Sequence, residues 1–183
     1  MRIITGKARG LKLVTPKDYR VRPTADRVKE ALFNIISAKI PGATVLDAFA
    51  GTGNLGLEAW SRGAVQITFL DFSVDSLKLV KANVAKARAE DACQLVKGDS
   101  LDSLVRLSRQ GKVFDIVFSD PPYNKGINER VVQTLLKYPL LKPQGLLVLE
   151  HSLEEEPRTY LPAAWEVRTE KYGDTKISLI LWK

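Results

Sequence analysis

Short apolar runs alternate with helically spaced apolar positions through most of the chain. Strands are predicted over 44–49, 66–71, 94–97, 114–119 and 146–150. Between them, apolar residues recur every three or four positions and predict helices over 53–62, 73–89, 102–109 and 129–137. This alternation is typical of an α/β fold in which helices cover both faces of a parallel, doubly wound sheet.

Both ends of the chain depart from this alternation. A helix is predicted from Thr24, its expected cap, to about Ile40, where Pro41-Gly42 stops it. Near the other end, residues 166–171 and 176–182 predict two strands joined at Gly173-Asp174. We therefore expect a Rossmann-like, mostly parallel sheet with an antiparallel C-terminal edge hairpin, preceded by a small N-terminal appendage over residues 1–40. The main domain is expected over 41–183.

The composition excludes several classes of protein. Of 183 residues, 45% are hydrophobic and 27% are charged, which is typical of a globular domain and not of a disordered or fibrous chain. One cysteine, Cys93, and one histidine, His151, are poor material for a transition-metal site, so no metal is expected. Without a disulfide framework, signal core or spanning apolar run, we expect a cytoplasmic protein that does not enter a membrane.

Positive charge is concentrated at the start of the chain. Residues 1–30 hold nine basic and three acidic residues, whereas the remainder is nearly neutral. This excess fits a polyanion such as nucleic acid as a partner, although a solvated basic face would show the same charge. Interleaved apolar residues predict a folded hairpin around Ala8-Arg9-Gly10. Its candidate RNA-binding residues are Arg2, Lys7 and Arg9.

A glycine loop follows the first predicted strand. Gly51 to Gly56 has the spacing G-x-G-x-x-G, which opens a helix in dinucleotide-binding folds. Asp71, at the end of the next strand, could accept from ribose hydroxyls. Asp47 separates the possible cofactors, because a carboxylate beside the loop would repel a pyrophosphate but attract a cation. S-adenosylmethionine carries an ammonium and a sulfonium and has no phosphate, so the residues favour it over NAD.

The tetrapeptide Asp120-Pro121-Pro122-Tyr123 closes another predicted strand at the same edge of the sheet. An exocyclic amine on a nucleobase is a poor nucleophile, because its lone pair is delocalised into the ring. The Asp120 carboxylate and the Pro121 carbonyl could hold the amine hydrogens and direct the lone pair, with the backbone angle φ fixed by the prolines. Tyr123 could stack on an extruded base. This pattern predicts methylation of a base amine.

Several segments together make the chain resemble the RsmD type of bacterial 16S ribosomal RNA guanine-N2 methyltransferases. The resemblance spans essentially the whole chain. Its main motifs are Met1-Arg2-Ile3-Ile4, Arg9-Gly10, Arg22-Pro23-Thr24, Asp26-Arg27-Val28, Asp47-Ala48-Phe49-Ala50-Gly51-Thr52-Gly53, Gly56-Leu57-Glu58-Ala59, Asp120-Pro121-Pro122-Tyr123 and Tyr172-Gly173-Asp174-Thr175. The resemblance implies a class I methyltransferase sheet and S-adenosylmethionine as cofactor. Asp71 stands where many members of the family have Glu.

The resemblance also assigns candidate roles. The catalytic residues would be Asp120, Pro121, Pro122 and Tyr123. The cofactor would be held by Asp47, Phe49, Gly51, Thr52, Gly53 and Asp71, with Asp99 accepting from the adenine amine beside Ser100. Arg22, Thr24 and Arg27 would join the hairpin in holding RNA. The implied substrate is small-subunit ribosomal RNA, with an assembling 30S particle and a monomeric enzyme expected.

Three alternatives are open, and a fourth, a protein-glutamine methyltransferase, would be expected to show Asn, not Asp, at position 120. A DNA adenine or cytosine amino-methyltransferase shares the Asp-Pro-Pro-Tyr motif, but such enzymes usually carry a recognition domain for which this chain has no room. A nicotinamide-dependent oxidoreductase would explain the glycine loop and leave Asp47 and Asp120 unexplained. A non-catalytic RNA-binding factor would not need an intact Asp120.

Overall fold

The computed structural model describes residues 1–16, 23–123 and 125–183. The described strands are β1 (Thr44–Asp47), β2 (Gln66–Asp71), β3 (Cys93–Lys97), β4 (Phe114–Ser119), β5 (Leu141–Ser152), β6 (Val167–Tyr172) and β7 (Thr175–Leu181). The α-helices are α1 (Pro23–Ile35), α2 (Asn54–Ser61), α3 (Val74–Ala87), α4 (Ser100–Arg109) and α5 (Ile127–Lys137). None of these described helices is long and apolar enough to cross a membrane.

The strands form one sheet in the order β3-β2-β1-β4-β5-β7-β6. Strands β1 to β5 pair in parallel, whereas β7 is antiparallel to both β5 and β6. The predicted doubly wound sheet with a C-terminal antiparallel hairpin is thereby confirmed. The hairpin joins the sheet through β7, so β6 forms the outer edge. Parallel β1 to β5 bring their carboxyl ends to one side, where ligands of such sheets bind.

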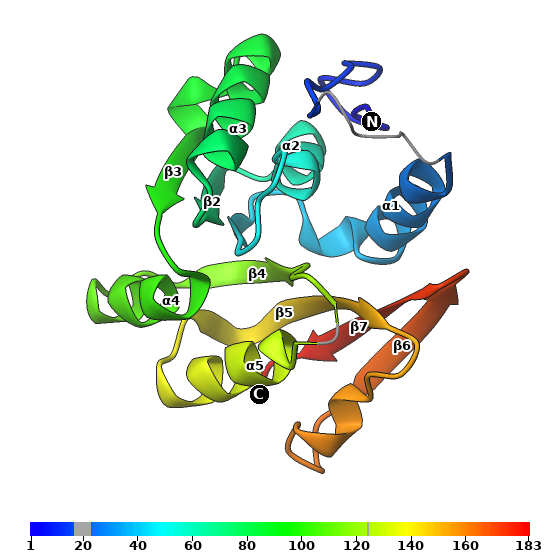
Figure 1. The fold of residues 1–183 in the computed structure, drawn as a ribbon, viewed down its shortest axis with the longest axis vertical. Helices are drawn as coiled ribbons and strands as arrows, with labels where there is room; N and C mark the ends of the chain where they lie inside the picture. The colour runs from blue at the N-terminus through cyan, green and yellow to red at the C-terminus, as the bar shows by residue number, and fades with distance from the viewer. Residues whose placement is uncertain (17–22, 124) are drawn as a thin grey trace.

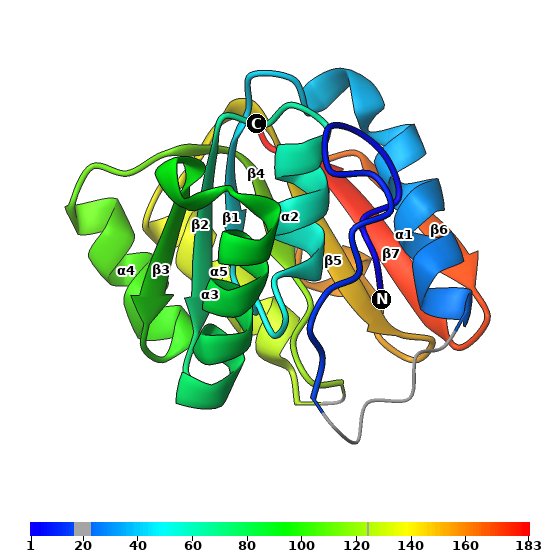
Figure 2. The same cartoon turned by 90° about the horizontal axis from the view of Figure 1, so that it is seen from above.

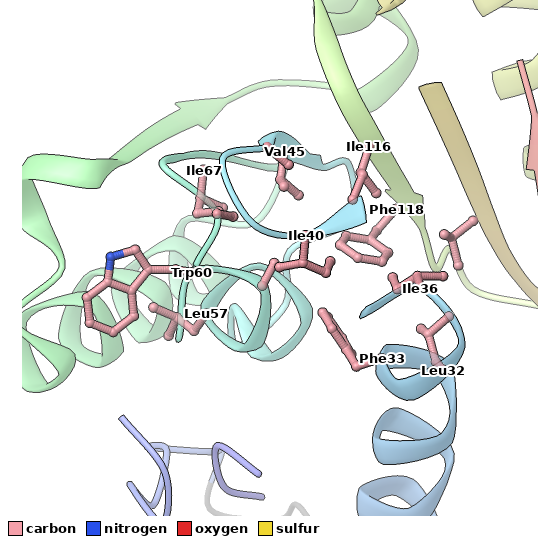
Figure 3. Packing of buried hydrophobic residues seen from close by; sticks show 14 of the residues in the cluster. Leu32, Phe33, Ile36, Ile40, Val45, Leu57, Trp60, Ile67, Ile116 and Phe118 are labelled. Atoms are coloured by element: carbon pink, nitrogen blue, oxygen red, sulfur yellow. The ribbon is translucent and has the colours of Figure 1, made fainter. Parts of the chain in front are cut away.

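Helices cover the two faces of the sheet, as Figure 1 shows. One buried cluster joins α1, α2 and α3 to one face, and a second joins α4 and α5 to the other. In the first cluster, Phe33 of α1 packs on Phe118 of β4 with ring centroids 5.6 Å apart (Figure 3). Ile3 and Leu13 belong to the same cluster, so the N-terminal segment shares the core of the main sheet.

The predicted N-terminal hairpin is confirmed as a short one. Arg2 pairs antiparallel with Lys12, and the Gly10 amide donates to the Ile3 carbonyl at 2.9 Å. In Figure 2 this segment runs alongside α2. Its turn lies at the C-terminal end of α2, because the Lys7 amide donates to the Ser61 carbonyl. The chain on either side of the turn returns toward the N-terminal end of the same helix.

The predicted bounds of the first helix were wrong at both ends. The helix begins at Pro23, so Thr24 lies within it instead of capping it. It ends at Ile35, and a separate 3-10 turn, Ser37–Lys39, follows it instead of a continuous helix to Ile40. The tighter turn ends with Ile40 buried in the core just before the chain turns at residues 41 and 42.

The last parallel strand was predicted too short. Strand β5 begins at Leu141 rather than at residue 146. Pro143 and Gly145 resemble loop residues in the sequence, but the strand absorbs them through an irregular register against β4. The end of β5, which faces the carboxyl edge of the sheet, lies close to its predicted position.

Candidate active site at the carboxyl ends of the strands

A cleft opens where β1, β2, β4 and β5 end. One part has a volume of about 630 Å³ and is lined by the glycine loop, the end of β2 and the Asp-Pro-Pro-Tyr loop. A neighbouring part of about 770 Å³ extends toward α1, β5 and the turn between β6 and β7. Both parts share Phe49, Gly51, Ser76, Asp120 and Tyr123. The sequence predictions for the cofactor and the target base therefore converge on one continuous cleft.

The glycine loop needs glycine for two different reasons. Gly51 and Gly53 have φ angles of +54° and +79°, which other residues rarely adopt, and Gly53 caps α2. Gly56 lies against β2, where an added Cβ would come within 2.3 Å of the Phe69 ring. The loop can therefore turn sharply while α2 packs closely on the sheet. Thr52, beside them, is nearly buried and donates to the Met1 sulfur at 3.1 Å.

Asp47 and Asp71 hold this loop through its backbone amides. The Gly56 amide donates to Asp47 Oδ2 at 3.0 Å, and the Gly51 amide donates to Asp71 Oδ2 at 2.9 Å. Asp71 Oδ1 accepts from the Ser73 amide at 2.8 Å. Each carboxylate oxygen has a second lone pair, so Asp71 can still accept a hydroxyl from the cleft that it lines.

Burial gives Asp47 an unusual protonation equilibrium. Its pKa is raised from 3.8 to about 7, chiefly because burial disfavours the charged carboxylate. The Gly56 amide opposes this effect, and the nearby charge of Asp71 adds to it. Two acids close together in a poorly solvated place favour a cation and disfavour another anion. The cleft next to the glycine loop is thus electrostatically suited to a positively charged ligand.

Three further predicted cofactor residues occupy different settings. Phe49 lines both parts of the cleft. Ser100 also lines it, and its hydroxyl donates to the Ala48 carbonyl at 2.9 Å. Asp99 is not among the lining residues of the cleft and caps α4 by accepting from the Leu101 and Asp102 amides. A contact between Asp99 and an adenine stays a prediction.

Asp120 lines the cleft with a carboxylate that has no hydrogen-bond partner among the described residues. Its side chain is exposed there. Its pKa is raised well above 3.8, because the walls of the cleft limit its hydration and because Glu150 and Asp47 repel its charge. Pro121 is buried beside it and fixes the course of the chain. This carboxyl is available to accept from a donor in the cleft.

Tyr123 joins the loop to the end of β5. Its hydroxyl donates to Glu150 Oε1 at 2.7 Å and contacts Thr175 Oγ1 at 2.8 Å. Burial raises its pKa, so the phenol is protonated at neutral pH. The residue is still 38% exposed. With the hydroxyl fixed and the side chain partly accessible, Tyr123 can present its ring to a base.

Sequence reasoning missed a buried side chain that ties the two strand ends together. Asn128 of α5 accepts from the Ser119 hydroxyl at 2.8 Å and donates to the Glu150 carbonyl at 3.0 Å. Ser119 directly precedes Asp120, so Asn128 fixes the end of β4 relative to the end of β5. Glu150 stands out in the sequence as an acid at the end of a strand, but nothing in the sequence indicates its bond to Tyr123.

Phe72 is another lining residue that the sequence reasoning missed. It follows Asp71 directly and is 72% exposed at the mouth of the cleft. The sequence signal that could have identified it is an aromatic residue directly after the acid that ends the predicted strand 66–71. Phe72 can cover a flat ligand.

A buried ionic cluster attaches the N-terminal segment beside the cleft. Glu58 of α2 accepts from the Ile4 and Thr5 amides at 2.8 and 3.1 Å. It also pairs with Lys29 at 3.1 Å and with Arg62 at 2.7 Å. Burial lowers the pKa of Lys29, which also donates to Asn54 Oδ1, at the start of α2, at 2.6 Å. The cluster therefore connects α1, the glycine loop and the N-terminal segment.

The predicted RNA-binding residues are dispersed. Arg2 is exposed and lies 3.6 Å from Asp26, and Arg27 is exposed on α1. Lys7 and Arg9 are exposed at the far end of α2, roughly 10 Å along the helix from the glycine loop. Lys7 also lies over the Trp60 ring, 3.9 Å from its centroid. The predictions for Arg22 and for the side chain of Thr24 lie outside the described residues.

Comparisons with known proteins identify the family of this chain. The family model described as "Conserved hypothetical protein 95" matches residues 1–181. Ribosomal RNA small subunit methyltransferase D of Escherichia coli K12 is 38% identical over 172 residues, which cover 93% of this chain and 84% of that protein. The same-named protein of Haemophilus influenzae is 36% identical and covers 93% and 88%.

Solved structures extend the likeness to three dimensions. A hypothetical protein of Thermus thermophilus, TTHA0928, has a TM-score of 0.82 and 30% identity, with 99% of both chains covered. SMU.776, solved as a complex with SAH, has a TM-score of 0.70 at 18% identity, covers 88% of this chain and 50% of that one, and shows the shared fold. The match over nearly the whole length confirms the resemblance seen in the sequence: this chain belongs to the family described as "Conserved hypothetical protein 95", together with proteins named ribosomal RNA small subunit methyltransferase D.

Proposed function

We propose that this protein is an S-adenosylmethionine-dependent methyltransferase that modifies the 2-amino group of a guanine in 16S ribosomal RNA. The observation that carries the proposal is Asp120, an acceptor without a protein partner among the described residues, in the cleft that the glycine loop borders. The relatives named ribosomal RNA small subunit methyltransferase D support the RNA substrate.

The residues of the cleft fit the proposed cofactor. Asp47 and Asp71 create a negative environment that favours the ammonium and sulfonium of S-adenosylmethionine over a pyrophosphate. Gly51 and Gly53 would let the backbone approach its methionine part, and Thr52 would flank it. Asp71 would accept the ribose hydroxyls, while Phe49, Phe72 and Ser100 line the space for the adenosine. When bound, S-adenosylmethionine supplies a methyl group on a positively charged sulfur that is already a good leaving group.

The chain itself contributes positioning and a proton acceptor. Asp120 and the Pro121 carbonyl would accept the two amine hydrogens, so that the nitrogen lone pair faces the methyl carbon. As the nitrogen–carbon bond formed, the carbon–sulfur bond would break and its electron pair would stay on sulfur. The methylated nitrogen then carries a positive charge and is acidic, and Asp120 can take its extra proton. Tyr123 would stack on the guanine during this step.

The N-terminal segment and α1 would guide the RNA to the cleft. Arg2 and Arg27 are exposed near the start of the chain and on α1, and Lys7 and Arg9 extend the charge along α2. Arg22 and Thr24 complete the proposed set. A small basic enzyme of this kind would recognise the shape of a large substrate, which favours a monomer acting on an assembling 30S particle in the cytoplasm.

A methyl-transfer assay tests the proposal. Tritium-labelled S-adenosylmethionine would be offered with small ribosomal subunits from cells lacking the modification, with naked ribosomal RNA, and with duplex DNA. We expect label in the RNA of the subunits and in none of the DNA. Label in DNA alone would overturn the RNA assignment. Absence of transfer to every substrate, despite cofactor binding by calorimetry, would overturn the assignment as an enzyme of nucleic-acid methylation.

A further inference from the structure

Four of the acidic side chains at the cleft lie at strand ends and fall into two groups, while a fifth acid, Asp174, lies in the turn between β6 and β7. Asp47 and Asp71 each accept hydrogen bonds from backbone amides of the glycine loop or its neighbours. Asp120 and Glu150 differ: among the described residues Asp120 accepts no hydrogen bond and Glu150 accepts one on a single oxygen, so both keep acceptors free in the cleft. Glu150 uses Oε1 for the Tyr123 hydroxyl at 2.7 Å, and its second oxygen, Oε2, accepts no hydrogen bond from the described residues. The cleft thus presents two adjoining acidic acceptors to whatever base enters it.

The relative position of these two acids is fixed. In the parallel pairing of β4 with β5, Ser119 stands opposite Leu149, so Asp120 and Glu150 occupy the next position on neighbouring strands. Strands so paired lie about 4.8 Å apart. Asn128 links the two strand ends through Ser119 and the Glu150 carbonyl. The Tyr123 hydroxyl then holds the Glu150 side chain from the other side.

Two adjoining acceptors match one base better than the others. On guanine, the N1–H donor lies directly beside the 2-amino donor. On adenine and cytosine, the ring nitrogen beside the amine carries no hydrogen and is itself an acceptor, so the free oxygen of Glu150 finds no donor there. A base extruded into an active site is read through hydrogen bonds to this edge, and a site built to pair with a donor strongly rejects an analogue that lacks it.

We propose that Glu150 determines the base specificity of this enzyme, its Oε2 accepting the N1–H of the target guanine while Asp120 holds the 2-amino group. This inference rests on the proposed function and names the residue that selects guanine. Asp120-Pro121-Pro122-Tyr123 holds an amine of any base, and Glu150 rejects bases with an acceptor next to that amine. Tyr123 orients Glu150 in addition to stacking on the base.

The test changes one hydrogen-bonding group on each side of the proposed contact. The substrate is small-subunit RNA carrying either guanine or 2-aminopurine at the methylated position. 2-Aminopurine keeps the amine but has an acceptor at N1. In Glu150→Gln, the amide oxygen can still accept from Tyr123, while the amide nitrogen can donate to N1 of 2-aminopurine. We measure kcat and KM for each pair of enzyme and RNA, with thermal unfolding and cofactor binding as checks of folding.

We expect Glu150→Gln to lower kcat/KM on guanine about 10- to 100-fold, the usual effect of losing a hydrogen bond to a charged group. Its preference for guanine over 2-aminopurine should fall at least about tenfold relative to the wild-type enzyme. Glu150→Asp, which keeps the charge, should retain the preference at a lower rate. Glu154→Gln changes an exposed acid beyond the end of the same strand and should leave kcat/KM unchanged on both RNAs.

An unchanged preference in Glu150→Gln, or an equal loss on both RNAs, would overturn the inference, because a purely structural role would affect both substrates alike. These outcomes leave the proposed function intact, since the wild-type enzyme still methylates guanine. Absence of guanine methylation by the wild-type enzyme would instead refute the proposed function itself.

Discussion

Asp47 makes the cofactor-free protein sensitive to pH. Its pKa is about 7 in the folded protein against an ordinary value of 3.8. Between these two values the folded state binds more protons than the unfolded state, so stability falls as pH rises. A pKa difference of this size corresponds to at most about 4 kcal/mol, at about 1.36 kcal/mol per pKa unit. This loss of folding stability is complete above a pH of about 7 and absent below a pH of about 4.

Asp47→Asn removes the ionisation while keeping an oxygen that can accept from the Gly56 amide. We expect the cofactor-free variant to be more stable than the wild type at a pH of about 8, by about 1–3 kcal/mol after some relaxation of the site, and to have no such advantage at a pH of about 4.5. Urea unfolding at the two pH values measures this difference. Asp102→Asn, the same chemical change at an exposed position of α4, serves as the matched control and should show no such dependence on pH.

The same substitution should weaken binding of the proposed cofactor. A cation bound beside Asp47 lowers its pKa, so affinity for S-adenosylmethionine should rise as the pH is raised from about 5 to about 7 in the wild type and rise less steeply in Asp47→Asn, where only the other acids of the cleft titrate. Calorimetry at several pH values measures both curves. If the stability change is the same at both pH values and the two affinity curves run parallel, the ionisation of Asp47 governs neither property.

Three other changes test separate parts of the site. Asp120→Asn should lower kcat at least about 100-fold and leave calorimetric affinity for S-adenosylmethionine within a factor of about three; a near-normal rate would contradict its role. Glu58→Ala should cost about 3–5 kcal/mol in urea unfolding, because it leaves Lys29 buried without its partner, and a loss below about 1 kcal/mol would contradict the importance of the cluster. Replacing Lys7 and Arg9 with Ala should weaken RNA binding and reduce the slope of log affinity against log salt by about 1 for each phosphate that these side chains neutralise; an unchanged slope would exclude both from the interface.

The sequence was sufficient to predict the sheet because strands β1, β2 and β4 are short apolar runs between well-marked helices. It also located the cleft, since ligands of parallel sheets bind where strands end and Asp47, Asp71 and Asp120 all lie there. Strand β5 was predicted too short, because Pro143 and Gly145 are tolerated by a register irregularity that no local pattern reveals.

The connections between elements could not be predicted in the same way. The bonds from Asn128 to Ser119 and Glu150 join residues from three elements, and the bonds of Glu58 to the N-terminal segment span more than 50 residues of sequence. Such pairings depend on how elements pack and not on local spacing. The basic N-terminal segment illustrates the same limit, because its charge was evident but the position of its turn at the far end of α2 was not.

The identity of the methylated nucleoside decides whether Asp120 and Glu150 hold a guanine. Small-subunit RNA labelled by the purified enzyme would be digested to nucleosides, separated by chromatography and identified by mass spectrometry. We predict that the label resides in N2-methylguanosine, and that Asp120→Asn nearly abolishes it. Label in a methylated adenosine or cytidine would contradict the assignment of guanine as the base that these two acids recognise.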